Sequence, residues 1–261
     1  MSAEYLEIPI RGRKFSYNVE IRERVHTQQT EFQTIEIVDT DAFGRMLLLD
    51  GHIQLTEMDE RAYHESLVQI PMLSIDNPTS ALVIGGGDGG VIRELCRHDS
   101  MQHIDMAEID AGVIEACKAH MPFLSVGAFE DPRVKLRITD AFEFVRTTSQ
   151  RYDLIVADST DVYEDEAGGL SEQLFTQGFY EDCRRVLKPG GLLVTQADNL
   201  VFCPYSLEGI RQVFGKVFDR VGSYQALVPS FGGFSGFCWA SVDGDVSLQF
   251  KENAHEAALA R

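Results

Sequence analysis

Four carboxylates stand at or just after the ends of apolar runs, where buried strands are expected to end. They are Asp88, Glu108, Asp140 and Asp158. Ligands of an open α/β sheet bind outside the carboxyl ends of its strands, so we expect these side chains to line one site. Asp161 follows Asp158 closely and adds a second acid at the mouth of that site. Such a cluster attracts cations and raises carboxylate pKa values, which suits a carboxylate that acts as a base.

A glycine-rich turn over residues 85–90 follows the first of these apolar runs. It matches the pattern G-x-G-x-x-G, in which glycines let backbone amides approach a ligand and aim a helix N-terminus at it. Dinucleotide enzymes and methyltransferases share this pattern, so it is weak evidence alone. Glu108 follows Asp88 by 20 residues, the spacing at which an acid binds ribose hydroxyls. The combination predicts a nucleotide-type cofactor.

Each acid also has a simpler interpretation. Glu108 can be a solvated strand end, Asp140 can cap a helix that starts at Ala141, and the pair Asp158 and Asp161 can belong to a solvated turn. The shared position of these acids at strand ends favours the site.

Strand and helix patterns alternate from Ser80 onward, which is typical of a parallel sheet with right-handed crossovers. The expected strands are 81–84, 104–109, 134–138, 152–157 and 192–196, the last after a turn at 188–191, then 223–228 and 236–240. A helix is expected over 206–218. The fold class is therefore α/β, with a Rossmann-like, methyltransferase-type, mostly parallel sheet.

The sequence before residue 58 predicts a small β domain. Apolar runs at 32–38 and 45–49 flank the turn-rich segment 39–44, which is a hairpin signal. A helix is expected from residue 59 to about 67. We therefore divide the chain into an N-terminal β-hairpin domain, residues 1–57, and a Rossmann-like catalytic domain, residues 58–261.

The chain is acidic, with 41 acidic and 23 basic residues among 261 and a net charge of −18. This balance disfavours nucleic acid as a partner and suits cationic ligands, although it also serves solubility alone. No apolar run approaches a membrane span and the first twenty residues make no signal peptide, so we expect a cytoplasmic protein with no membrane partner. Five cysteines without C-x-x-C and seven histidines without H-x-H or H-x-x-x-H predict reduced thiols and no metal.

Several segments together resemble the polyamine aminopropyltransferases, the family that includes spermidine synthase. The resemblance runs from about Gln33 to Ala240. It rests on the segments 49–57, 59–60, 63–65, 84–90, 93–94, 108–110, 158–161 and 228–229. This combination is far more specific than a glycine loop.

The resemblance implies decarboxylated S-adenosylmethionine as the co-substrate and an aliphatic amine as the acceptor. Family positions around the donor match Gln33, Leu49, His64, Gly86, Asp88, Glu108, Ile109, Asp140, Ala141 and Ser159. Positions around the amine match Gln54, Tyr63, Asp161, Gln196 and Phe231. Asp158 matches the carboxylate that accepts the amine's proton.

The chemistry agrees with these assignments. The donor lacks a carboxylate and is a dication, so Asp88 can pair with its ammonium and repel the carboxylate of ordinary S-adenosylmethionine. An alkylamine with a pKa of about 10.4 must lose a proton before it attacks the carbon beside sulfur. Sulfonium is already a good leaving group, so orientation and one base suffice without a metal. The products would be the elongated polyamine and methylthioadenosine.

Departures from the common family pattern gather on the acceptor side. Phe231 stands where many members carry a tyrosine, and Val162 replaces a proline. The segment 163–173 is longer than usual and acidic, with a glycine pair. We expect it to close over the amine, although an idle surface loop explains it equally well.

The acceptor is accordingly the open part of the assignment. Putrescine, which would give spermidine, is favoured over agmatine or spermidine on base rate. An amine N-methyltransferase on the same fold and a non-catalytic polyamine-binding subunit are the alternatives from other classes. Asp88 argues against the first, and the retained acids Asp158 and Asp161 argue against the second. The resemblance to the family implies that the chain forms a homodimer or homotetramer.

Overall fold

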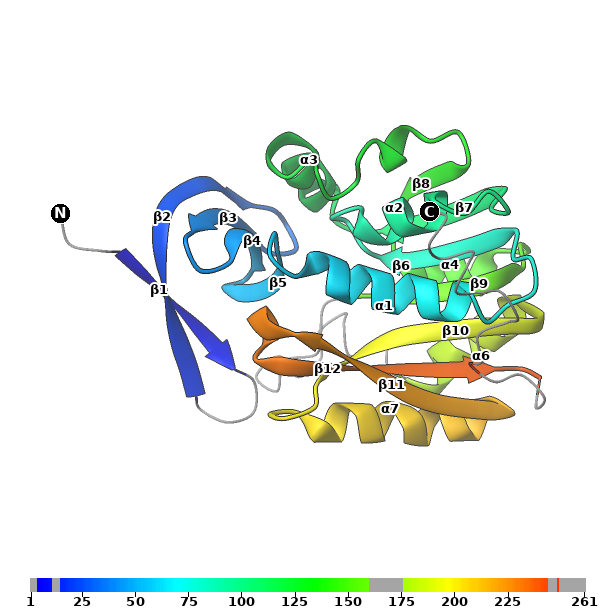
Figure 1. The fold of residues 1–261 in the computed structure, drawn as a ribbon. Coiled ribbons are helices and arrows are strands. Elements are labelled where there is room, and N and C mark those ends of the chain that lie inside the picture. The colour runs from blue at the N-terminus through cyan, green and yellow to red at the C-terminus, as the bar shows by residue number, and fades with distance from the viewer. Residues whose placement is uncertain (1–3, 11–14, 160–175, 244–247, 249–261) are drawn as a thin grey trace.

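The computed structural model describes residues 4–10, 15–159, 176–243 and 248, which form two sheets and the helices around them (Figure 1). The first sheet has five strands in chain order, each antiparallel to the next. They are β1 (Glu4–Ile10), β2 (Phe15–Gln29), β3 (Thr34–Thr40), β4 (Gly44–Leu49) and β5 (His52–Thr56). The hairpin predicted from the turn-rich segment is the β3–β4 pair.

The second sheet has seven strands in the order β11-β12-β10-β9-β6-β7-β8. They are β6 (Ser80–Gly85), β7 (His103–Glu108), β8 (Val134–Ile138), β9 (Tyr152–Asp158), β10 (Leu187–Asn199), β11 (Arg220–Val228) and β12 (Gly233–Ser241). The five strands from β8 to β10 are parallel, and β12 runs antiparallel to β10 and β11. The chain moves outward from β6 through β7 to β8 and then returns to β9, so a topological switch point lies between β6 and β9.

Helices cover both faces of this sheet (Figure 1). They are α1 (Glu60–Met72), α2 (Gly90–Cys96), α3 (Ala111–His120), α4 (Ala141–Thr147), α6 (Gln177–Val186) and α7 (Pro204–Val217), with the short 3₁₀ turns η1 (Ala128–Glu130) and η2 (Pro229–Phe231). Side chains alternate along each strand, so Ala81 and Val83 pack with α1 and α2, whereas Leu82 and Ile84 pack with α4, α6 and α7. Both faces of β6 are therefore buried.

The five-stranded sheet packs on α3. Ile35, Ile37 and Leu47 share a buried cluster with Val113 and Ala116 of that helix. This apolar contact brings the N-terminal sheet up to the carboxyl ends of β6 and β7. The division of the chain at residue 57 remains a prediction, although β5 ends at Thr56 and α1 begins at Glu60.

The structure corrects one local expectation. Residues 188–191, expected as a turn before a strand, lie inside β10, which begins at Leu187. The pairing of β10 with β9 shifts register between Leu187 and Leu192, and Gly190 has a φ of +74°. The Pro-Gly-Gly signal thus marks an irregularity in a strand. Within the described residues, no helix has the length and apolar character needed to span a membrane.

Candidate active site

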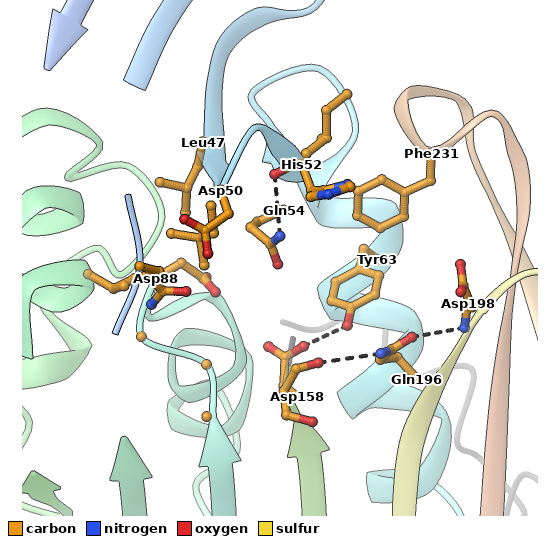
Figure 2. Close-up of a pocket in the computed structure, with 18 of the residues that line it drawn as sticks. Leu47, Asp50, His52, Gln54, Tyr63, Asp88, Asp158, Gln196, Asp198 and Phe231 are labelled. Carbon is orange, nitrogen blue, oxygen red and sulfur yellow. Dashed lines mark hydrogen bonds between the residues drawn. The ribbon is translucent and has the colours of Figure 1, made fainter. Parts of the chain in front are cut away.

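A cavity of about 440 Å³ lies between the carboxyl ends of the parallel strands and the five-stranded sheet (Figure 2). The site residues predicted from the sequence line it: Gln33, Leu49, Gln54, Tyr63, His64, Gly86, Asp88, Glu108, Ile109, Asp140, Ala141, Asp158, Ser159, Gln196 and Phe231. Asp161 and the segment 163–173 lie outside the described residues. The structure thus brings the predicted residues together, and their individual roles remain proposals.

The glycine turn joins the ends of β6 and β9 closely. A Cβ atom at Gly85 would lie 2.2 Å from the carbonyl oxygen of Asp158, and Gly85 has a φ of +77°. The amide of Gly86 donates to that same carbonyl at 2.9 Å. At the start of α2, a Cβ on Gly90 would lie 2.3 Å from the His64 ring. Glycine at these two positions lets β9 and α1 deliver their side chains to the turn.

Asp158 lies at the end of β9 beside a second carboxylate and a histidine. One polar atom each of His64, Asp88 and Asp158 lies within 4.8 Å of the others. The Tyr63 hydroxyl donates to Asp158 Oδ1 at 2.6 Å, a bond that Figure 2 shows. Burial and the negative charge of Asp88 raise the pKa of Asp158 to about 6, against the opposing effects of His64 and Tyr63. A partly buried carboxylate with such a pKa is suited to accept a proton near neutral pH.

His64 lies between two carboxylates that favour its charged form. Burial lowers its pKa, but the charge of Asp88 and hydrogen bonds to Asp88 and Glu60 outweigh burial and raise the pKa to about 10. Its Nε2 lies 3.2 Å from Asp88 Oδ1, and its Nδ1 lies 2.8 Å from Glu60 Oε2. Arg93 donates to both oxygens of Glu60 at 3.0 and 2.9 Å. This buried network fixes the orientation of the imidazolium.

The same three side chains are also the group of described residues that are spaced to hold a metal ion: His64, Asp88 and Asp158. A metal-binding imidazole must be neutral with a free lone pair. Both ring nitrogens of His64 instead face carboxylates, in the arrangement of two donors. The residues therefore suit an organic cation better than a metal, and the absence of a metal stays a prediction.

Glu108 is the last residue of β7 and lines the cavity. Burial raises its pKa to about 7, with a smaller contribution from the charge of Asp110. The Asp110 amide donates to Glu108 at 2.8 Å, and the Asp110 side chain caps α3 through Gly112. The side-chain amide of Gln33 donates to Asp110 at 2.9 Å. Gln33 thus reaches the cavity from the connection between β2 and β3 and is anchored at the start of α3.

The structure confirms the helix cap expected of Asp140, and its contact with a ligand stays a prediction. Its side chain accepts from the amide of Phe142 at 2.8 Å and caps α4, as the simpler interpretation holds. It also lines the cavity beside Ala141. Capping uses one carboxylate oxygen of Asp140, so the cap does not exclude a ligand contact.

The side of the cavity opposite Asp88 is made of segments that lie far apart in the sequence. Figure 2 shows Asp88 and Phe231 on opposite sides, with Tyr63 between them. The ring of Phe231 meets Tyr63 edge-on, with centroids 5.7 Å apart. Gln196, near the end of β10, donates to the Ser159 carbonyl at 3.3 Å and accepts from the Asp198 amide at 2.8 Å.

Asp198 is a lining residue that sequence reasoning missed. It lies on β10 with a φ of +62°, a left-handed conformation that aspartate tolerates better than most residues. The signal was available, because Asp198 follows the apolar run of the fifth expected strand as the other acids follow theirs. Ile8, Pro9 and Tyr17 of the N-terminal sheet also line the cavity without having been predicted.

Two family models match the chain. The model described as "Spermine/spermidine synthase domain" matches residues 60–251. The model described as "Spermidine synthase tetramerisation domain" matches residues 5–57. Together they span both sheets.

Curated relatives and solved structures agree with these models. The polyamine aminopropyltransferases of Pectobacterium carotovorum (strain PC1) and Klebsiella pneumoniae (strain 342) are each 42% identical over 218 residues, 83% of this chain and 74% of each relative. A crystal structure of spermidine synthase in complex with the transition state analogue AdoDATO has a TM-score of 0.88 at 28% identity, covering 100% of this chain and 92% of that one. Spermidine synthase from Thermotoga maritima has a TM-score of 0.87 at 27% identity, covering 100% and 91%.

Proposed function

The chain belongs to the spermine/spermidine synthase family, and from this premise we propose that it transfers an aminopropyl group from decarboxylated S-adenosylmethionine to putrescine. The products are spermidine and methylthioadenosine. The observation that carries the proposal is the pair of partly buried carboxylates Asp88 and Asp158, set with the buried His64 at the strand ends of one cavity. Two carboxylates there suit a reaction between two cationic substrates.

The donor's ammonium is assigned to Asp88. Decarboxylated S-adenosylmethionine carries a sulfonium and an ammonium but no carboxylate, so it complements an anionic pocket. Ordinary S-adenosylmethionine would bring a carboxylate toward Asp88 and be repelled. The nucleoside part is assigned to Glu108 and Asp140, whose positions at the ends of β7 and β8 support contacts to ribose and adenine.

Asp158 is assigned as the base. The acceptor enters as an ammonium, and Asp158 takes one proton so that nitrogen has a lone pair. That lone pair forms the new C–N bond to the carbon beside sulfur while the C–S bond breaks. The electron pair of that bond goes to sulfur, which leaves as the neutral thioether of methylthioadenosine. The hydroxyl of Tyr63 holds Asp158 by a 2.6 Å hydrogen bond.

The amine is assigned to the side of the cavity lined by Gln54, Tyr63, Gln196 and Phe231. Asp198 adds a carboxylate that sequence reasoning missed and that suits the distal ammonium of a diamine. The edge of Phe231 and the ring of Tyr63 suit the methylene chain between two amino groups.

One assay tests the whole proposal. Purified protein is incubated with decarboxylated S-adenosylmethionine and with putrescine, cadaverine, agmatine, spermidine or norspermidine, and products are separated by mass. We expect the mass of one aminopropyl group to be added, with the highest kcat/KM for putrescine. Methyl transfer from intact S-adenosylmethionine would instead indicate an amine N-methyltransferase, and binding of amines without any transfer would indicate a non-catalytic polyamine-binding subunit.

Assembly into a homodimer or homotetramer is a further part of the proposal. The match of residues 5–57 to a tetramerisation domain supports it. Light scattering behind size exclusion at several protein concentrations measures the number of chains directly. A monomer at all concentrations would refute it.

A further inference from the structure

The turn η2 forms one wall of the amine side of the cavity. It joins β11 to β12 and carries Phe231, whose ring meets Tyr63. A turn that connects two strands at the edge of a sheet is ordinarily free to vary. Here its polar groups are held by side chains from three distant parts of the chain.

Two backbone oxygens of η2 are bound by such side chains. The Tyr17 hydroxyl, from β2 of the N-terminal sheet, donates to the Ser230 carbonyl at 2.6 Å. The side-chain amide of Asn199, at the end of β10, donates to the Phe231 carbonyl. Burial and the nearby charge of Asp59 raise the pKa of Tyr17, so its hydroxyl keeps its proton and remains a donor.

Asp59 holds the same turn from the other side. Its Oδ2 accepts from the Ser230 amide at 2.7 Å and its Oδ1 from the Ser230 hydroxyl at 2.9 Å, and Ser230 is fully buried. The Thr56 hydroxyl donates to Asp59 Oδ1 at 2.6 Å and orients the carboxylate.

The position of Asp59 makes this use of its carboxylate unusual. Asp59 is the N-cap residue of α1, where an aspartate normally accepts from amides of its own helix. It makes no such capping bond. Its carboxylate instead binds Ser230, 171 residues further along the chain. The Asp59 carboxylate thus does not stabilise its own helix by capping and instead makes a long-range contact with η2, the wall of the cavity.

We propose that Asp59 and Tyr17 are positioning residues for the amine acceptor, which fix η2 so that Phe231 presents one surface to the cavity. Through Tyr17, the N-terminal sheet takes part in acceptor selection. This inference rests on the proposed aminopropyl transfer. Tyr17 also lines the cavity, but its hydroxyl is bound to the Ser230 carbonyl, so both residues act on η2 through Ser230.

The physical consequence is a sharper discrimination between amines of different length. A wall held by buried hydrogen bonds on its amide, carbonyl and hydroxyl cannot shift to admit a longer acceptor without breaking them. If one bond is removed, the wall moves more easily. The preferred amine then binds less well and the others are excluded less strongly.

The test uses Tyr17→Phe, which removes one hydroxyl and keeps the ring. We expect the KM for the best amine to rise about three- to tenfold and the ratio of kcat/KM between putrescine and spermidine to move toward one. Affinity for methylthioadenosine and kcat at saturating amine should stay within about twofold, because Tyr17 bonds on the amine side. Tyr5→Phe is the matched control, since Tyr5 bonds Glu20 on the exposed part of the same sheet.

Variants of the other contacts to Ser230 should change the KM for amine by different amounts. Asp59→Asn keeps an oxygen for the Ser230 amide and should perturb the KM for amine less than Asp59→Ala does. Ser230→Ala removes only the hydrogen bond of the Ser230 hydroxyl. It replaces Asp59→Ala as the test of this contact if Asp59→Ala does not fold. Fluorescence-monitored unfolding of each variant separates loss of fold from loss of positioning.

A binding experiment keeps this inference distinct from the proposed function. Calorimetric titration of methylthioadenosine-loaded protein with putrescine needs no turnover, and Tyr17→Phe should weaken that binding as it raises the KM. Wild-type protein that binds putrescine but transfers nothing would overturn the proposed function alone. Unchanged putrescine affinity and unchanged acceptor ranking in Tyr17→Phe and Ser230→Ala would overturn this inference, as would equal weakening of methylthioadenosine and putrescine.

Discussion

The two halves of the cavity are built on different principles. The half proposed to bind the donor, here called the donor half, lies at the ends of neighbouring parallel strands: Glu108 ends β7, and Asp88 and Asp140 follow β6 and β8. The half proposed to bind the acceptor, here called the acceptor half, is assembled from segments far apart in sequence, such as those that carry Gln54 and Phe231. The position of a donor-half residue is therefore set by the sheet topology. The acceptor half depends on long-range contacts that can change without disturbing the sheet.

Two neighbouring acids at the start of α1 support different halves of the cavity. Asp59 binds Ser230 in the wall of the acceptor half. Glu60 binds His64, which lies 3.2 Å from Asp88 in the donor half. A single peptide bond thus joins the supports of both halves. Variants that separate the effects of these acids test whether the two halves work independently.

The largest effect is expected at the boundary between the halves. Asp158→Asn removes the base, so turnover should fall by about 10²- to 10⁴-fold. Affinity for methylthioadenosine should remain close to wild type, because the nucleoside is assigned to the donor half. Single-turnover rates and calorimetry measure the two quantities on one preparation. Turnover near the wild-type rate would remove Asp158 from the role of base.

Asp88→Asn should damage the donor half selectively. Removing one partner of a buried charge pair typically costs about 2–5 kcal/mol of binding free energy. Decarboxylated S-adenosylmethionine should therefore bind much more weakly, and methylthioadenosine, which has no ammonium, much less so. Parallel calorimetric titrations compare the two ligands, and equal losses for both would contradict the assignment.

The same variant makes a pH prediction. The charge of Asp88 raises the pKa of Asp158, which is about 6 in the wild type. A base must be ionised to act, so kcat/KM should fall as the pH drops through about 6. In Asp88→Asn the pKa of Asp158 should be lower, and this acidic limb should move to lower pH. An acidic limb at the same pH in both proteins would show that another group controls it.

Glu60→Gln should affect the donor half by a smaller amount. Loss of this charge lowers the pKa of His64 and weakens the imidazolium that lies beside Asp88. We expect kcat/KM for the donor to fall about tenfold, the usual scale for a residue that supports a ligand-binding side chain. The KM for amine should change little, in contrast to Asp59→Ala. Glu65→Gln, in the same helix but half-exposed, is the matched control.

The difference between the halves also explains what could be predicted from the sequence. Asp88, Glu108 and Asp140 were found because each follows an apolar run at a strand end. Phe231 needed the family resemblance, since no local pattern places a residue of a β11–β12 connection opposite Asp88. Asp59 entered only as part of the family resemblance, and its contact with Ser230 could not be predicted, because an acid before a helix ordinarily caps that helix. Contacts over 171 residues leave no local signal in one sequence.

The smallest expected effect is a pH dependence confined to the donor half. Burial raises the pKa of Glu108 to about 7 in the free protein. Ribose hydroxyls donate to a carboxylate better than to a carboxylic acid, so binding of methylthioadenosine favours the ionised form. Affinity should therefore be constant above about pH 8 and fall as the pH drops through about 7, by no more than tenfold per pH unit. Titrations at pH 6, 7 and 8 measure this fall.

Glu108→Gln provides the control for this effect, because glutamine cannot ionise. The variant should bind methylthioadenosine more weakly at pH 8 and show a nearly flat affinity from pH 6 to 8. Asp158→Asn should keep the wild-type slope, since Asp158 is assigned to proton transfer from the amine and not to the nucleoside. If Asp158→Asn abolishes the slope instead, proton binding at Asp158 controls the affinity for methylthioadenosine. The donor and acceptor halves would then be coupled through the carboxylate that lies between them.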